Sequence, residues 1–369
     1  MNEVKINAQQ LLALMVLFNM GTALVVSLGT TAERDAWIAT SLGAAGGIIL
    51  FGVYAALFRL GPKLQLIGHL RLLGKPIGLV LGMLYIIFFL YGASRDLRDG
   101  GDLLINSVLD QTPLIVVEAS MILAIAYVLD KGLEVLARTA QIFLIVLLLV
   151  GLLSVVLLFC SNVIETERLF PILGDGWGAV LTPFLKQTFE FPYTELICFM
   201  VILPSVNQPN QGLRFGFVAV LISGVILTIS SILQIAVLGV DITSHSTFPL
   251  LDMIGLIEMG AFVQRLDVFF VLFLIVGVFF KTAIFYYACV SSITDLFHIR
   301  DKRTLILPVG LLILAASLIN SGNFAEHIEE GNIALHTVFV SMGGAIPVIL
   351  LMGGWLKKWR RWKKVHPEP

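Results

Sequence analysis

Long apolar runs recur along the whole chain, and they constrain its fold more than any other feature. A helix needs about 20 mainly apolar residues to cross the hydrocarbon core of a bilayer. Runs of that kind occur about ten times, and each marks the core of one predicted span. These cores lie near residues 10–28, 36–58, 77–97, 113–129, 136–160, 183–203, 214–238, 266–290, 304–320 and 334–355. The pattern predicts an all-α integral membrane protein with about ten transmembrane helices.

The amino-acid composition excludes several other classes of protein. Hydrophobic residues make up 58% of the 369 positions and charged residues 13%, which is about half the charged share of a soluble domain. The net charge of -1 gives no indication of nucleic-acid binding. Cys160, Cys198 and Cys289 lie in apolar runs and indicate no disulfide framework. No zinc-type spacing, phosphate-binding loop or nucleophile elbow is present, so we expect no metal, no cofactor and no enzymatic activity.

Lysine and arginine indicate the orientation of the chain in the bilayer. They are concentrated on the side of the two termini, above all in "KKWRRWKK" at residues 357–364, so both termini are predicted to be cytoplasmic. We expect one transmembrane domain over residues 1–369, with residues 357–369 as a basic cytoplasmic tail. This tail is expected to anchor the chain at the bilayer surface, and binding of a headgroup or partner is the alternative. Residues 241–267 predict a short helix over the extracellular mouth, with a lid as its functional interpretation.

Polar residues in the middle of the first predicted span mark the first candidate site. Asn19, Gly21 and Thr22 stand close together there. Glycine lowers helix propensity, and the polar side chains can bind freed backbone groups. The stretch predicts a local break in the helix. The alternative is that the small residues only allow close packing against a neighbouring helix.

The sixth predicted span contains the second candidate site. Pro192 cannot donate an N–H group, so the helix is expected to end near Phe189–Phe191 and a new half-helix to begin at Pro192. Glu195 then lies in the first turn of this half-helix, where the helix dipole favours an anion. Glu190 lies at the less favourable end of the preceding half. The alternative is a proline kink with no chemical role.

Lys281, near the centre of the eighth predicted span, is the third candidate. An ammonium at that depth needs a carboxylate or several carbonyl oxygens as partners. Glu190, Glu195 or the backbone of an unwound first helix are the expected partners. The alternative is an ion pair that only locks two helices together.

The end of the third span carries a further run of charges, "ASRDLRDGGDLL". Arg95 with Asp99, and Arg98 with Asp102, stand at i,i+4 spacing and are expected to pair along one helix face. We interpret this run as the solvated outer end of a long helix, with a place in an outer vestibule as the alternative.

Breaks in the first and sixth of ten spans are five helices apart. This spacing is typical of transporters built from two inverted repeats of five helices, with a small-ligand site at the midplane between the broken helices. The first repeat would cover about residues 9–160 and the second about 183–356. Half-helix N-termini there can hold an anionic group, and a nearby carboxylate can hold an ammonium.

Several motifs in order along the chain resemble one family. They are "FPYTEL", "LRDGGDLLINSVLDQTP", and the run from "FPLLDMIGLIEMGAFVQRLD" through "GVFFKTAIFYYACVSSITDLF". The chain resembles the B subunit of GerA-type spore germinant receptors, a branch of the amino acid/polyamine/organocation (APC) permease superfamily. Thr194 replaces the glycine usual before the glutamate, which is expected to narrow the pocket beside Glu195. Leu274 lies near the place of an expected tryptophan.

The resemblance implies a LeuT-type fold and a receptor in the inner membrane of a dormant spore, assembled with an A subunit and a lipoprotein-like C subunit. It implies that this subunit binds a nutrient germinant, commonly an amino acid, and signals. The expected ligand contacts are Gly21, Thr22, Phe191, Pro192, Tyr193 and Glu195, with Asn19 and Glu190 as further candidates. Lys281 would stand where sodium sits in sodium-driven relatives. The alternatives are a proton-coupled amino acid permease and a water or ion conduit.

Overall fold

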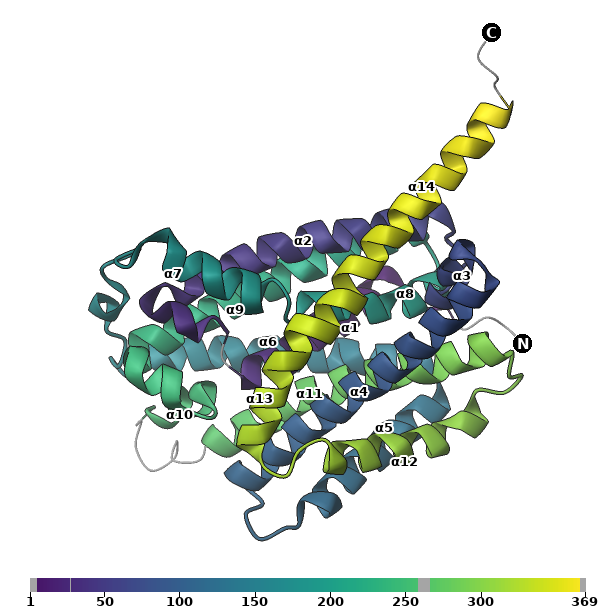
Figure 1. Ribbon diagram of the computed structural model, residues 1–369. Helices are drawn as coiled ribbons and strands as arrows, with labels where there is room; N and C mark the ends of the chain where they lie inside the picture. The colour runs from purple at the N-terminus through teal and green to yellow at the C-terminus, as the bar shows by residue number, and fades with distance from the viewer. Residues whose placement is uncertain (1–4, 27, 258–265, 366–369) are drawn as a thin grey trace.

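The structure is a computed structural model, and it describes residues 5–26, 28–257 and 266–365. Helices dominate this part of the chain (Figure 1). The long helices are α1 (Ala8–Val25), α2 (Ala36–Leu60), α4 (Lys75–Ser107), α5 (Leu114–Lys131), α6 (Leu133–Cys160), α9 (Pro209–His245), α11 (Leu266–Phe297), α12 (Arg303–Ile319) and α14 (Ile346–Val365). The shorter ones are α3 (Leu66–Leu70), α7 (Gly176–Pro183), α8 (Phe199–Ile202), α10 (Pro249–Gly255) and α13 (Phe324–Ala334).

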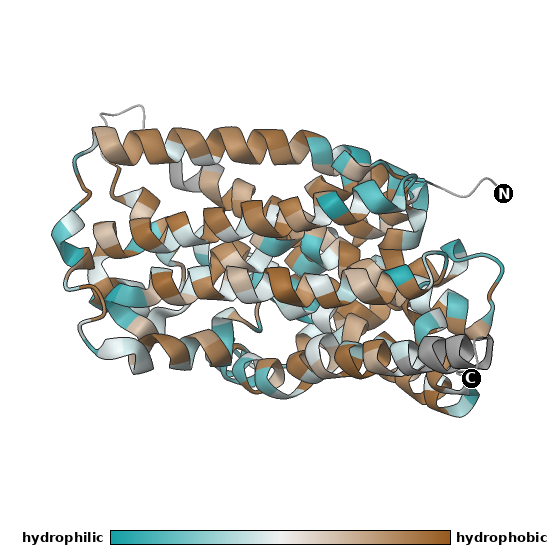
Figure 2. Cartoon of the chain, turned by 90° about the horizontal axis from the view of Figure 1, so that it is seen from above, coloured by the Kyte–Doolittle hydropathy of each residue, from teal (hydrophilic) through white to brown (hydrophobic). Residues whose placement is uncertain are grey.

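Seven helical stretches of the described chain are long and apolar enough to cross a membrane. The three other predicted spans differ for identifiable reasons. α5 carries three charged residues, α12 has 17 residues, and the sixth span is divided into short pieces. Figure 2 shows hydrophobic residues along the helices and most hydrophilic residues at the two ends of the bundle. The chain is therefore a multi-pass membrane protein, as its sequence predicts.

Both ends of the described chain lie toward the same end of the bundle, where α3 also lies (Figures 1 and 2). A chain that crosses the bundle an even number of times has both of its ends on the same side. The tenth span is longer than expected, because α13, a π-helical stretch at Leu335–Ala345 and α14 follow one another without interruption. α14 continues to Val365 and projects beyond the bundle in Figure 1, so the predicted basic tail begins as a helix.

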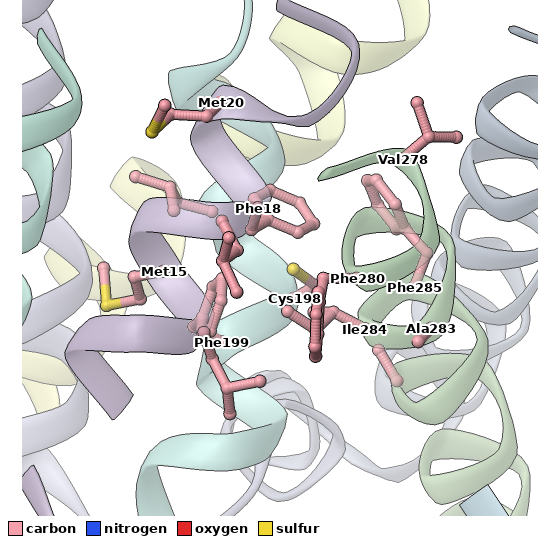
Figure 3. Packing of buried hydrophobic residues seen from close by; sticks show 14 of the residues in the cluster. Met15, Phe18, Met20, Cys198, Phe199, Val278, Phe280, Ala283, Ile284 and Phe285 are labelled. Carbon is pink, nitrogen blue, oxygen red and sulfur yellow. The ribbon is translucent and has the colours of Figure 1, made fainter. Parts of the chain in front are cut away.

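The first helix is the centre of the packing. Its start is fixed by a capping box, in which the Asn7 side chain accepts a hydrogen bond from the Gln10 N–H and the Gln10 side chain accepts one from Asn7. A helix that is apolar on all sides is normally buried on all sides, and α1 is almost fully buried. Figure 3 shows Phe18 between Phe199 and Phe285, with ring centroids 5.3 Å from each.

Gly21 kinks α1 where the sequence predicts a weak point. Its backbone angles, φ -32° and ψ -105°, are not helical. The same residue also allows close packing, because a Cβ atom at Gly21 would lie 2.9 Å from the Lys281 Cβ and 3.0 Å from the Gly277 carbonyl oxygen on α11. The two interpretations of the glycine, a break and a close contact, both hold.

The sixth span is broken at Pro192, as predicted. α7 passes into a π-helical turn at Phe184–Thr188, residues 189–192 form turns, and a 3₁₀ helix begins at Tyr193 with Pro192 as its cap. Glu195 lies in the first turn of that 3₁₀ helix. The Tyr54 hydroxyl of α2 donates a hydrogen bond to the Thr194 carbonyl oxygen at 3.2 Å, which holds the broken segment against α2.

Backbone hydrogen bonds also join the two broken spans at the end of the bundle where the chain begins. The Ile6 N–H donates to the Ser205 carbonyl at 2.9 Å, and the Asn207 N–H donates to the Ile6 carbonyl at 2.9 Å. They form a short parallel bridge between Ile6 and Val206, and both residues are buried.

α10 is the short helix predicted after the seventh span, and it packs against α9 and α11. Residues 258–265 of the same predicted segment lie outside the described residues. The position of α10 over an extracellular mouth, and its role as a lid, stay predictions.

Candidate functional site

Lys281 of α11 lies at the centre of a buried cluster of charges. Its Nζ atom is 2.7 Å from Glu195 Oε2 and 3.4 Å from Asp96 Oδ1 of α4. It also donates a hydrogen bond to the Thr22 hydroxyl of α1 at 2.6 Å. All four side chains are buried. One ammonium therefore joins α1, α4, α11 and the broken sixth span.

Aromatic rings complete the surroundings of this ammonium. Lys281 Nζ lies 4.3 Å from the centroid of the Phe191 ring and 5.7 Å from that of Phe18. Cation–π contacts of this kind stabilise a desolvated cation. Of the expected partners, which were Glu190, Glu195 and the backbone of the first helix, Lys281 pairs with Glu195.

A cavity of about 70 Å³ lies directly beside the cluster. Thr22, Phe191 and Glu195, three of the residues singled out in the sequence, line it. Its other walls come from α4, from Gln187 before the break, and from α13 with the π-helical stretch that follows. The volume holds several water molecules or a small organic group.

The other candidate ligand contacts lie elsewhere. Gly21 contacts Lys281 through the kink of α1, and Asn19 donates a hydrogen bond to Ser223 of α9 at 2.8 Å. The Tyr193 ring packs at Gly47, where a Cβ atom would come within 2.4 Å of it. Neither Tyr193 nor Pro192 is among the residues that line the cavity.

Thr194 does not narrow the pocket beside Glu195, contrary to expectation. Its hydroxyl donates a hydrogen bond to the Glu190 carbonyl at 2.5 Å, and its Cβ faces Gly343 in the π-helical stretch. A Cβ atom on Gly343 would lie 2.2 Å from the Thr194 carbonyl oxygen. The side chain at position 194 thus packs away from the cavity.

Glu190 pairs with a residue that the sequence did not indicate. Its Oε2 lies 2.7 Å from His336 Nδ1, and the His336 side chain is 43% exposed. This pair joins the break in the sixth span to the tenth span, separately from Lys281.

We expect Glu190→Gln to change stability little, by about 0–1 kcal/mol, because a partly exposed ion pair contributes little. Thermal unfolding of the purified full-length protein measures this effect. A loss of folded protein in Glu190→Gln would show that the pair with His336 is essential to the break.

The charged run at the end of the third predicted span is buried, and its interpretation as a solvated helix end is wrong. α4 continues through it to Ser107, and Arg98, Asp99 and Asp102 are each less than 10% exposed. Arg98 pairs with Asp102 at 2.8 Å, as the i,i+4 spacing predicts.

The second predicted pair is replaced by contacts with α13. Arg95 pairs with Glu330, and Asp99 Oδ1 lies 2.8 Å from His327 Nε2. Since α13 lies over the cavity, these two contacts connect one wall of the cavity to another.

Asp96 is the functional candidate that the sequence analysis missed. The signal was present, because the positions three and four residues away from it are Gly92, Ala93, Asp99 and Gly100. No cation stands at any of them, so Asp96 has no partner on its own helix face. A buried carboxylate without a local cation needs a distant one, and here it is Lys281.

Comparison with known proteins shows the family of the chain. The profile of the spore germination protein family, Spore_permease, matches residues 5–325. Spore germination protein KB of Bacillus subtilis (strain 168) is 36% identical over 370 residues, which cover 100% of this chain and 99% of that protein. Spore germination protein YndE of the same organism is 23% identical over 90% of this chain and 89% of its own length.

Solved structures show the fold. MhsT in complex with L-phenylalanine is 16% identical, with a TM-score of 0.71 over 94% of this chain and 89% of that one. Mhp1, a nucleobase-cation-symport-1 family transporter in a closed conformation, is 13% identical, with a TM-score of 0.68 over 95% and 78%. These neighbours confirm the predicted LeuT-type membrane fold.

The relatives and the fold are those of non-enzymatic membrane proteins, in agreement with the sequence. The match covers the motifs "FPYTEL" and "GVFFKTAIFYY", which carry the resemblance and contain Glu195 and Lys281. By its family profile and its full-length relative, the chain belongs to the spore germination protein family, as a GerA-type B subunit with an APC-like permease fold.

Proposed function

We propose that this subunit binds a small nutrient germinant, in the simplest case an amino acid, in the cavity beside Lys281, and that binding signals germination. The observation that carries the proposal is the buried cluster of Lys281, Glu195 and Asp96, whose two carboxylate residues line that cavity. Ionisable groups inside membrane spans face a cavity or a partner and mark functional sites by default. We further propose that the subunit acts with A and C subunits in the spore inner membrane, with both termini cytoplasmic.

A ligand signals only if it binds two conformations with different affinity. Such a difference is supported by the contacts around the cavity. Arg95–Glu330 and Asp99–His327 join two of its walls, α4 and α13. Asp96–Lys281 joins the α4 wall to α11 behind it. A molecule among these helices changes the relative free energies of open and closed arrangements. The change would then pass to the partner subunits.

A working proton-coupled amino acid permease is the second candidate. The buried ionisable groups on broken helices, and the transporter fold, support it. Uptake of radiolabelled glycine into liposomes that contain this chain alone distinguishes the two functions. Concentrative uptake supports the permease, and binding without uptake supports the receptor.

We expect Glu195→Gln to abolish the response of spores to their nutrient, measured as loss of optical density and release of the spore-core solutes. The substitution keeps the size of the side chain but removes the charge that Lys281 pairs with. Glu190→Gln is the matched control, because Glu190 flanks the same break and pairs with His336 instead. An unchanged response in Glu195→Gln spores with a normal protein level would contradict the site.

A further inference from the structure

We propose that Asp96 binds the ammonium group of the germinant, so that the ligand of this subunit is a small molecule with a primary ammonium. The inference rests on the proposed function and names the chemistry of its ligand. Three observations carry it, namely the balance of charges around the cavity, the contacts of the Asp96 carboxylate, and the size of the cavity.

Most of the described charged groups around the cavity have one ionisable partner each. Arg95 pairs with Glu330, and Asp99 contacts His327. Arg98, further along α4, pairs with Asp102. Lys281 alone faces two carboxylates, those of Glu195 and Asp96. With both carboxylates ionised, this cluster has one negative charge more than its single ammonium balances.

Asp96 is the less closely paired of the two carboxylates. Lys281 Nζ lies 3.4 Å from Asp96 Oδ1 but 2.7 Å from Glu195 Oε2. Both contacts of the Asp96 carboxylate fall on one oxygen: Oδ1 faces Lys281 and accepts a hydrogen bond from the Thr22 hydroxyl at 3.3 Å. Oδ2 is buried and has no hydrogen-bond partner among the described residues. Asp96 is 3% exposed and lines the cavity.

A buried carboxylate oxygen without a partner is costly, and native proteins rarely leave one unsatisfied. A ligand ammonium in the cavity would donate a charge-assisted hydrogen bond to Oδ2 and supply the missing positive charge. The Arg95 guanidinium already contacts Glu330 and the His327 carbonyl. Among its described lining residues the cavity thus offers one carboxylate oxygen without a partner and no unpaired cation, and it favours positive charge.

The volume of about 70 Å³ limits the group that reaches Asp96 to a few heavy atoms. Phe191, Leu335 and Phe339 form apolar walls that suit a short aliphatic body. Glycine and methylammonium fit these limits. Glycolate, which has a hydroxyl in place of the amino group of glycine, does not supply the ammonium.

Thermal unfolding of the purified full-length protein in detergent tests the proposal. The added solutes are glycine, methylammonium chloride, sodium glycolate and sodium chloride at equal ionic strength. We expect glycine and methylammonium to raise the melting temperature of the wild type, since a ligand that binds the folded state stabilises it. Glycolate and sodium chloride are expected to leave it unchanged.

In Asp96→Asn the stabilisation by both ammonium compounds is expected to weaken by about tenfold or more in apparent affinity, as for loss of a hydrogen bond to a charged group. Glu118→Gln is the control, because Glu118 is another buried carboxylate of the bundle that bonds to Ser317 and does not line the cavity. It is expected to keep the wild-type response. If Asp96→Asn does not fold, competition between methylammonium and radiolabelled glycine on the wild type provides the test.

Three results would overturn the proposal. One is no stabilisation of the wild type by either ammonium compound, or no competition between them. Another is stabilisation by glycolate equal to that by glycine. The third is equal stabilisation by sodium chloride that is lost in Asp96→Asn, which would make the site one for an inorganic cation.

If Glu195→Gln abolishes germination while Asp96→Asn binds normally, the inference fails and the proposed function stands. If Glu195→Gln spores respond normally, the proposed function fails.

Discussion

Replacing Lys281 by methionine is expected to destabilise the protein by about 3–5 kcal/mol, because it removes one partner of a buried ion pair and leaves two carboxylates uncompensated. Lys281 is fully buried, and Glu195 and Asp96 are each less than 5% exposed, so bulk water solvates the remaining charges poorly. Thermal unfolding of the purified full-length protein measures the loss. Spores that carry Lys281→Met as their only copy are expected not to respond to nutrients.

A charge-neutral combination separates the electrostatic effect from packing. Adding Glu195→Gln and Asp96→Asn to Lys281→Met removes all three charges, so we expect much of the stability to return while the response stays absent. Replacing a complete buried ion pair by well-packed hydrophobic groups is often close to neutral for stability, and uncharged amides cost less to bury than uncompensated carboxylates. If Lys281→Met alone lowers the melting temperature but the spores respond normally, the cluster only locks helices together.

Gly21→Ala is expected to have the second large effect. A Cβ atom at this position would lie 2.9 Å from Lys281 Cβ and 3.0 Å from the Gly277 carbonyl oxygen, so α1 and α11 must move apart. Overpacking of this kind costs about 1–3 kcal/mol. The movement would also separate Thr22 from Lys281, which are now 2.6 Å apart. We therefore expect a lower melting temperature and a weakened germination response.

Gly52→Ala on α2 is the matched control, since a Cβ atom there meets no other group within 4 Å. It is expected to leave stability unchanged or slightly raised, because alanine favours the helix. Equal melting temperatures for Gly21→Ala and Gly52→Ala would show that the contact between α1 and α11 adapts without cost.

The spans and their breaks could be predicted because they depend on local properties. The lengths of the apolar runs indicated the helices, and Gly21 and Pro192 marked the two interruptions. The place of Glu195 in the first turn after Pro192 followed from the same reasoning. The boundaries of two inverted repeats, 9–160 and 183–356, stay a prediction.

The partners across the bundle could not be predicted, because they depend on which helix faces which. The i,i+4 spacing that pairs Arg98 with Asp102 also suggested Arg95 with Asp99, yet α13 supplies Glu330 and His327 instead. Glu190 likewise finds His336, about 150 positions away along the chain. The partner of Asp96 could not be read from local spacing either, because no cation stands three or four positions away from it.

The bridge between Ile6 and Val206 joins two segments that are 200 positions apart in the chain. Because two backbone hydrogen bonds join them, we expect the beginning of the first span and the end of the sixth to move together. An opening of the bundle at that end is then expected to move both segments together as one rigid body. We then expect the response to a small molecule to involve the opposite halves of these spans, after Gly21 and before Pro192.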